Sequence, residues 1–160
     1  MVGYPASLVA TAVTVALVAN ALAVLAAGAL CDVLPVRMVH RAGAALVLLA
    51  SWPFFHAVSA PGGAADLVQL LAGFGAIGGV VSGAFAVVLA GLFPVRVRFS
   101  GVALAFNTSF ALFSGLAPAA ATGLIAGIGH KAAPAYYLAG AAAIALVAGL
   151  WISKPDAPSR

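Results

Sequence analysis

The opening stretch MVGYPASLVATAVTVALVANALAVLAAGALC (1–31) contains no charged side chain. Asp32, Arg37 and Arg41 follow it, and a second uncharged stretch then begins. An apolar run of this length exceeds the roughly 20 residues that an α-helix needs to cross the hydrocarbon core of a bilayer. A membrane-spanning segment must also satisfy its own backbone hydrogen bonds, which restricts it to helices and closed barrels. The opening of the chain therefore predicts a transmembrane helix that ends in a short charged loop.

The composition of the whole chain excludes an ordinary soluble domain. Of its 160 residues, 65% are hydrophobic and only 6% are charged, whereas globular domains carry about 25% charge. The net charge of +4 does not indicate a nucleic-acid partner, because the arginines lie singly or in pairs between apolar runs. Cys31 is the single cysteine, which excludes an internal disulfide and a CxxC metal or redox site.

Uncharged windows recur along the chain and predict an all-α integral membrane protein with five transmembrane helices. No window shows the alternation of apolar and polar residues that barrel strands require, and the abundant alanine favours helices. We expect one transmembrane domain over residues 1–160. Its predicted helices cover residues 7–30, 42–60, 67–92, 100–127 and 133–153.

The loop cations predict the orientation in the membrane. Lys131 alone falls on one side, and the other six cations share the opposite side: Arg37, Arg41, Arg96, Arg98, Lys154 and Arg160. Cytoplasmic loops carry the excess of Lys and Arg. We therefore expect a multi-pass protein of a cell inner membrane or plasma membrane, with its N-terminus outside and its C-terminus in the cytoplasm.

Several motifs carry a resemblance to a known family. The segment LFPVRVRFSG (92–101), with Phe106 and Asn107 downstream, resembles the loop between the tenth and eleventh helices of the metabolite:proton symporters in the major facilitator superfamily. Further segments are similar to family motifs in the same order: GALCD (28–32), PFF (53–55), ALFSGLAP (111–118) and PAYY (134–137). The resemblance implies that the five helices correspond to helices eight to twelve of a twelve-helix transporter, which is most of its C-terminal half.

The chain also departs from the family pattern. Family members continue D-R-x-G-R-R after the loop aspartate, but VLPV (33–36) follows Asp32, and Gly91 stands where an acidic residue usually precedes L-F-P. The resemblance implies that the first seven helices, with the proton-coupling groups, lie outside this chain. We therefore expect the chain alone not to transport, and a separate N-terminal half is a candidate partner.

The fourth predicted helix carries the candidate substrate pathway. Asn107 is the most polar group inside it, and on a helical wheel it shares a stripe with Ser114, Pro118 and Thr122. The resemblance implies that this stripe lines the pathway. On its own, the stripe fits close packing and hydrogen bonding between helices better.

Other residues suggest a gate and a packing face. The resemblance assigns Asp32, Arg37, Arg96 and Arg98 to a cytoplasmic gate, although topological anchoring explains the arginines equally well and Asp32 could be a solvated loop charge. A tandem small-xxx-small face predicts tight helix packing and consists of Gly75, Gly79 and Gly83.

Three more polar residues allow plain structural readings. Asn20 suggests a hydrogen bond between helices. Asp66 and Gln69 suggest a helix cap. A lone histidine such as His56 is more often an interface residue than a proton relay.

These features predict secondary active transport of a small polar metabolite, such as an organic acid, a zwitterion or a compatible solute. The transport would be proton-coupled and would proceed by alternating access in the lipid bilayer. The alternative is a non-transporting membrane scaffold or interaction module. An enzyme is poorly supported, since no catalytic triad or carboxylate pair is evident, and neither a cofactor nor a metal is predicted.

Overall fold

The computed structural model describes residues 4–60 and 63–151, and within them the chain is helical with no strand. The elements are α1 (Ala6–Val33), α2 (Val36–Ser59), α3 (Ala64–Gly91), α4 (Arg98–Ser109), the π-helical turn η1 (Phe110–Ser114), α5 (Gly115–Ile128) and α6 (Pro134–Trp151). Because α4, η1 and α5 run on without a break, the structure has five helical spans long and apolar enough to cross a membrane. The predicted all-α fold with five transmembrane helices is confirmed.

The predicted helix boundaries are less accurate than the number of helices. The second helix begins at Val36 instead of residue 42, because Pro35 supplies the turn and Arg37 and Arg41 continue as helix. Charged residues end an apolar window without ending a helix, whereas proline is accepted at a helix start. The predicted end of the last helix at residue 153, together with Lys154 and Arg160, lies outside the described residues.

A helix cap also differs in detail from its prediction. The third helix begins at Ala64, so Asp66 is its third residue, and the carboxylate Oδ2 accepts a hydrogen bond from the Gly63 N–H at 2.8 Å. Asp66 therefore caps the helix by accepting from the N–H of the residue before it, and Gln69 takes no part in this cap. A carboxylate at this position also interacts favourably with the helix dipole.

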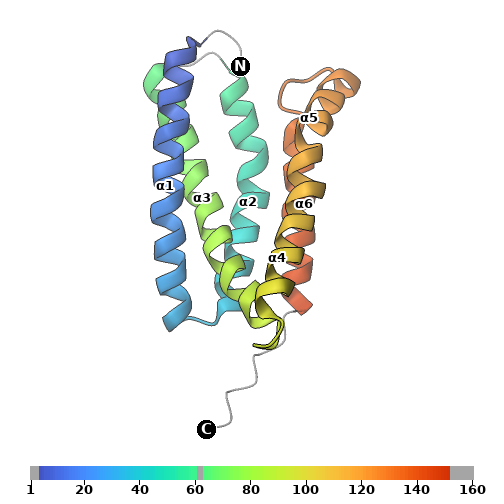
Figure 1. Cartoon of the computed structure of the whole chain (residues 1–160). Helices are drawn as coiled ribbons and strands as arrows, with labels where there is room; N and C mark the ends of the chain where they lie inside the picture. The colour runs from blue at the N-terminus through green and yellow to red at the C-terminus, as the bar shows by residue number, and fades with distance from the viewer. Residues whose placement is uncertain (1–3, 61–62, 152–160) are drawn as a thin grey trace.

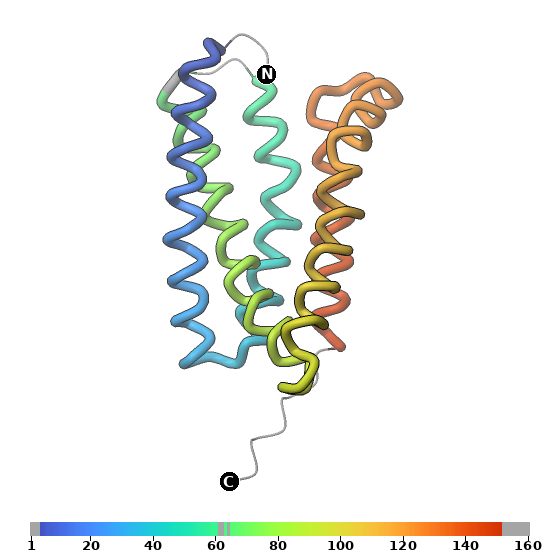
Figure 2. Tube along the Cα trace, in the orientation of Figure 1, coloured from blue at the N-terminus to red at the C-terminus, as the bar shows by residue number. Residues whose placement is uncertain are grey.

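The spans lie roughly side by side (Figures 1 and 2). Helix α3 packs against α1 and α2, and α6 packs mainly against α2, whereas α5 has a smaller contact with α6. The connections α1–α2 and α3–α4 share the lower end of Figure 1, and the α5–α6 loop lies at the upper end. Arginines 37, 41, 96 and 98 therefore gather at one end of the bundle and Lys131 lies at the other.

The contact between α1 and α3 depends on glycine. A Cβ atom added to Gly75 would lie 2.5 Å from the carbonyl oxygen of Ala16, and one added to Gly83 would lie 2.6 Å from that of Val24. A Cβ on Gly79, one turn from each, would collide with the α1 backbone as well. The three glycines thus let two backbones touch, which is how membrane helices gain close packing.

A side-chain hydrogen bond reinforces this interface. Asn20 Nδ2 of α1 donates to the Gly75 carbonyl oxygen of α3 at 3.0 Å, so the predicted hydrogen bond between helices is confirmed. Such bonds contribute roughly 0.6 kcal/mol on average within membrane proteins. Small side chains fill the nearby core, where Ala27 and Ala84 are fully or almost fully buried together with Val39.

A comparison of two alanine substitutions in α3 tests the glycine contact. We expect Gly79→Ala to lower the free energy of unfolding by about 1–3 kcal/mol, because the new methyl group overpacks against α1. Gly73→Ala is the matched control, since nothing lies within 4 Å of an added Cβ there, and it should be neutral or stabilising through helix propensity. Unfolding in detergent followed by circular dichroism provides the measurement. Equal effects of the two substitutions would contradict the contact.

Candidate functional site

The span Arg98–Ile128 contains a widened turn. The Gly115 N–H donates to the Phe110 carbonyl, five residues back, which defines the π-helical turn η1. Pro118 follows one turn later and has no N–H to donate to Ser114, while its ring crowds the Ser114 carbonyl. Proline and π-bulges are the usual causes of a helix irregularity, and such bulges often mark functional sites.

This turn corrects the predicted polar stripe. The stripe assumed an uninterrupted α-helix from Asn107 to Thr122, but η1 takes one residue more than an α-turn. Residues after it are rotated by roughly 100° relative to those before it. Ser114, Pro118 and Thr122 still share a face through their spacing of four, while Asn107 lies on a neighbouring face.

All four of these residues are exposed, and no residue of their span is buried inside the described bundle. Asn107 Nδ2 donates to the Ala103 carbonyl oxygen at 2.8 Å, and the Thr122 hydroxyl lies 3.0 Å from the Pro118 carbonyl oxygen. The second N–H and the Oδ1 of Asn107 make no hydrogen bond within the described chain, although both can form one. The span therefore presents polar groups whose hydrogen-bonding capacity is only partly used.

A tyrosine from α6 reaches the widened turn. The Tyr137 hydroxyl donates to the Phe113 carbonyl oxygen of η1 at 2.5 Å. Phe106 and Phe110 stack on the same span with ring centroids 4.5 Å apart. The turn is thus held both by an aromatic pair along its own helix and by a hydroxyl from the neighbouring helix.

An open cavity of about 1310 Å³ lies at the arginine-bearing end of the bundle, between α2, α3, η1 and α6. Its lining is mainly apolar, and its polar contributors include Arg37, His40 and Ser109. Phe113 of η1 forms part of one wall. The structure therefore places one predicted gate residue, Arg37, on the same cavity as Phe113 of the widened turn, whereas Asn107, Ser114, Pro118 and Thr122 do not line it.

The predicted gate residues do not form a charge cluster. Arg98 Nε donates to the Phe93 carbonyl oxygen at 3.2 Å, and no ion pair joins Asp32, Arg37 and Arg96 within the described chain. Asp32 is exposed in the last turn of α1, where a carboxylate interacts unfavourably with the helix dipole. Its position is therefore not explained by helix stability.

Two residues that the sequence analysis did not assign to the site connect α2 to α6. Arg41 Nε donates to the Gly149 carbonyl oxygen at 2.9 Å, and His40 Nε2 lies 3.2 Å from that of Ala145. A Cβ added to Gly149 would lie 2.9 Å from His40 Cδ2, so glycine admits the ring. Cations at helix C-termini bind free carbonyls and complement the dipole. No local sequence signal indicated these contacts, because the partners lie more than a hundred residues later in the chain.

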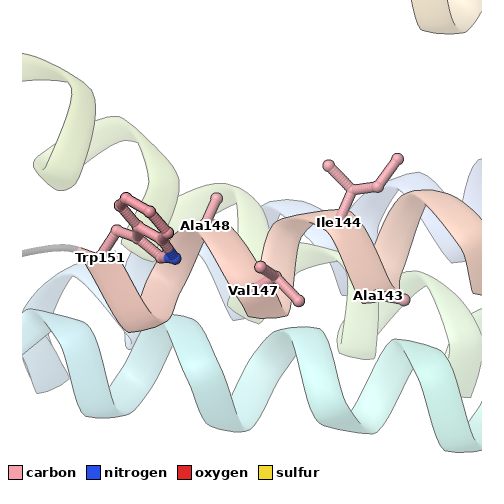
Figure 3. A pocket seen from close by; sticks show the side chains of 5 residues that line it. All are labelled: Ala143, Ile144, Val147, Ala148 and Trp151. Atoms are coloured by element: carbon pink, nitrogen blue, oxygen red, sulfur yellow. The ribbon is translucent and has the colours of Figure 1, made fainter.

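A second hollow lies along α6. Figure 3 shows its lining, in which Trp151 and aliphatic side chains such as Ile144 and Val147 follow one face of the helix. Ile144 and Trp151 also line the large cavity, so the two hollows adjoin. No group of three or more potential metal ligands occurs in the part of the chain that the structure describes.

Known proteins similar to this chain are transporters. A citrate-proton symporter of Salmonella typhi is 33% identical over 121 residues, which cover 76% of this chain and 28% of that protein. A citrate-proton symporter of Klebsiella pneumoniae is 31% identical over 130 residues, covering 81% of this chain and 29% of that protein. A glycine betaine/proline/ectoine/pipecolic acid transporter of Dickeya dadantii is 40% identical over 73 residues, covering 46% and 14% respectively.

These relatives confirm the predicted resemblance to metabolite:proton symporters, and they are transporters, not enzymes. The chain spans less than a third of the length of the citrate-proton symporters that it matches. No family model and no solved structure matches it. The chain is therefore a multi-pass membrane protein that is similar to part of these transporters.

Replacement of the tyrosine hydroxyl tests the contact with η1. We expect Tyr137→Phe to lower the free energy of unfolding by about 0.5–1.5 kcal/mol, because a helix–helix hydrogen bond is lost while the ring remains. Tyr136→Phe is the control, since that ring packs against Trp52 at a centroid distance of 5.3 Å and does not need its hydroxyl for the contact. If the two variants unfold alike in detergent, the hydroxyl does not hold the turn.

Proposed function

We propose that this chain, a homologue of metabolite:proton symporters, forms five helices of the C-terminal half of a proton-coupled secondary transporter. The transported class is a small polar metabolite: an organic acid, a zwitterion or a compatible solute. The similarity to citrate-proton symporters and to a betaine transporter supports these classes. Transport would follow alternating access, in which two halves rock about a site near the membrane midplane.

The observation that carries the proposal is the exposed polar face of the α4–η1–α5 span. Asn107 keeps unused donor and acceptor groups, and Ser114 and Thr122 are exposed on the same span. Burying polar groups in hydrocarbon without partners costs several kcal/mol. This face is therefore better suited to water, substrate or another protein segment than to lipid.

The pathway role is assigned to Asn107, Ser114, Pro118 and Thr122, with the geometry revised by η1. Ser114, Pro118 and Thr122 would form one strip of the wall, and Asn107 would contact substrate from the adjacent face. Transporters build substrate sites from interrupted helices, whose irregular backbone lines a cavity. The π turn followed by Pro118 supplies such an interruption here.

The gate is assigned to Asp32, Arg37, Arg96 and Arg98, at the end of the bundle that we place in the cytoplasm. The N-terminus would then lie outside and the C-terminus inside the cell. Asp32 opposes the dipole of its own helix, which supports a role in the conformational cycle. Arg37 borders the large cavity and could meet Asp32 or a group from the missing half when the gate closes.

The chain supplies only one wall of such a pathway. We propose that the opposing wall comes from a separate or preceding N-terminal half, which would also carry the proton-coupling groups. The alternative function is a non-transporting scaffold, and the lack of buried residues on the α4–η1–α5 span would then reflect a partner protein that covers it. Water access to the polar face distinguishes the two functions.

Cysteine labelling tests the pathway wall. With Cys31 replaced by serine, single cysteines at positions 107, 114 and 122 should react with a membrane-impermeant maleimide in membranes that contain the assembled carrier. A cysteine at Leu116 is the control, because this side chain is exposed and apolar on the same span and lies two residues from Ser114, on another side of the helix. It should stay protected by lipid. Protection of all four positions would contradict the pathway and favour the scaffold.

Uptake by the reconstituted chain tests its incompleteness. In proteoliposomes with an imposed pH gradient, accumulation of citrate and of glycine betaine should equal that of empty vesicles, since half of the cavity is absent. Coexpression with an N-terminal half should restore uptake. Clear proton-driven accumulation by the chain alone would show that the proposed incompleteness is wrong while supporting transport.

A further inference from the structure

A group of stacked aromatic side chains lies at the end of the bundle opposite the arginines. His130, in the loop between α5 and α6, stacks on Trp52 of α2 with centroids 6.0 Å apart and 17° between the planes. It also stacks near His56, at 6.5 Å and 16°. Trp52 and His56 are four residues apart on α2 and so share a face of that helix. The imidazole of His130 therefore lies over two consecutive turns of α2.

A backbone N–H of the loop uses one nitrogen of His130 as its acceptor. The Ala132 N–H donates to His130 Nδ1 at 3.1 Å. This hydrogen bond needs a lone pair on Nδ1, which the tautomer with its hydrogen on Nε2 provides. Ala132 is fully buried, and its N–H therefore depends on this imidazole nitrogen.

Protonation of His130 would remove that acceptor. An imidazolium has hydrogens on both nitrogens, so the buried Ala132 N–H would face a donor instead of an acceptor. The stacked Trp52 would favour a cation, but a buried donor left without a partner costs more than an exposed cation–π contact returns. A second charge on His56 would add repulsion. Histidine changes charge between about pH 5 and 8, within the range of external acidification.

The surrounding titratable groups do not offset this effect. The titratable side chains near His130 are His56 of α2, Lys131 of the loop and Tyr136 of α6. None of these residue types carries a negative charge near neutral pH. Asp66 of α3 is engaged by the Gly63 N–H. Among the described residues, no carboxylate therefore pairs with a protonated His130.

We propose that His130 is a proton-sensitive latch, which in its neutral form holds the α5–α6 loop against α2 and on protonation releases it. The loop joins the loosely attached α4–η1–α5 span to α6, so release would free the end of that span. The positive-inside topology would place the latch outside the cell. The inference does not depend on the proposed transport function, because the contact lies within this chain.

Hydrogen exchange and fluorescence of the full chain in detergent test the latch. Relative to the intrinsic exchange rate at each pH, protection of the amides in 129–133 should fall about tenfold or more between pH 7.5 and 5.5. Amides in 14–22 of α1 should keep their protection. With Trp151→Phe as background, Trp52 emission should change over the same pH range.

Two substitutions of His130 separate the latch from simple quenching of Trp52. Asparagine places an amide oxygen near the position of Nδ1 and does not titrate, so His130→Asn should keep the loop protected at both pH values. Glutamine reaches further and does not reproduce Nδ1, so His130→Gln should leave the loop unprotected throughout. His56→Asn should retain the transition. Loop protection that is independent of pH in the parent, or that responds to pH equally in His130→Asn, would overturn the proposal.

Discussion

Lipid offers no hydrogen-bond partner to a peptide group, and this constraint explains most of the polar contacts in the structure. The regular parts of each span satisfy their own backbone, so side chains are needed where helices end, bend or touch. Arg41 and His40 meet carbonyls of the last turns of α6. Tyr137 meets a carbonyl of the widened turn, and Asn20 meets one at the α1–α3 contact. These four side chains therefore serve the fold by satisfying carbonyl oxygens of neighbouring helices.

The α1–α3 pair and the α4–η1–α5 span are held in the bundle by different means. Glycines bring α1 and α3 into backbone contact, and a Cβ at any of the three positions would force the helices apart. The α4–η1–α5 span has no buried residue and is attached through α6, the Tyr137 hydroxyl and the loop at His130. The α1–α3 pair is therefore closely packed, whereas the α4–η1–α5 span is held by few contacts, and regions with few buried contacts open most readily.

The candidate site was only partly predictable from the residues. The polar positions of the fourth span could be identified, because polar residues are rare in so apolar a stretch. Their arrangement could not be predicted, because a helical wheel assumes a constant rise and rotation per residue, which η1 interrupts. Pro118 signalled an irregularity without specifying that the turn would widen. His40 was overlooked because its importance arises from Ala145 and Gly149, more than a hundred residues later in the chain.

Hydropathy and loop charge were enough to establish a five-span helical membrane protein, because the length of a span is set by the thickness of the bilayer and not by its neighbours. The motifs also sufficed to identify the symporter relatives. The start of α2, the true course of the polar face and the pairing of His130 with Trp52 depended on the folded chain. The first two depend on where the backbone turns or widens, which hydropathy does not encode. The third is a contact between segments distant in sequence, and a local pattern carries no information about such a partner.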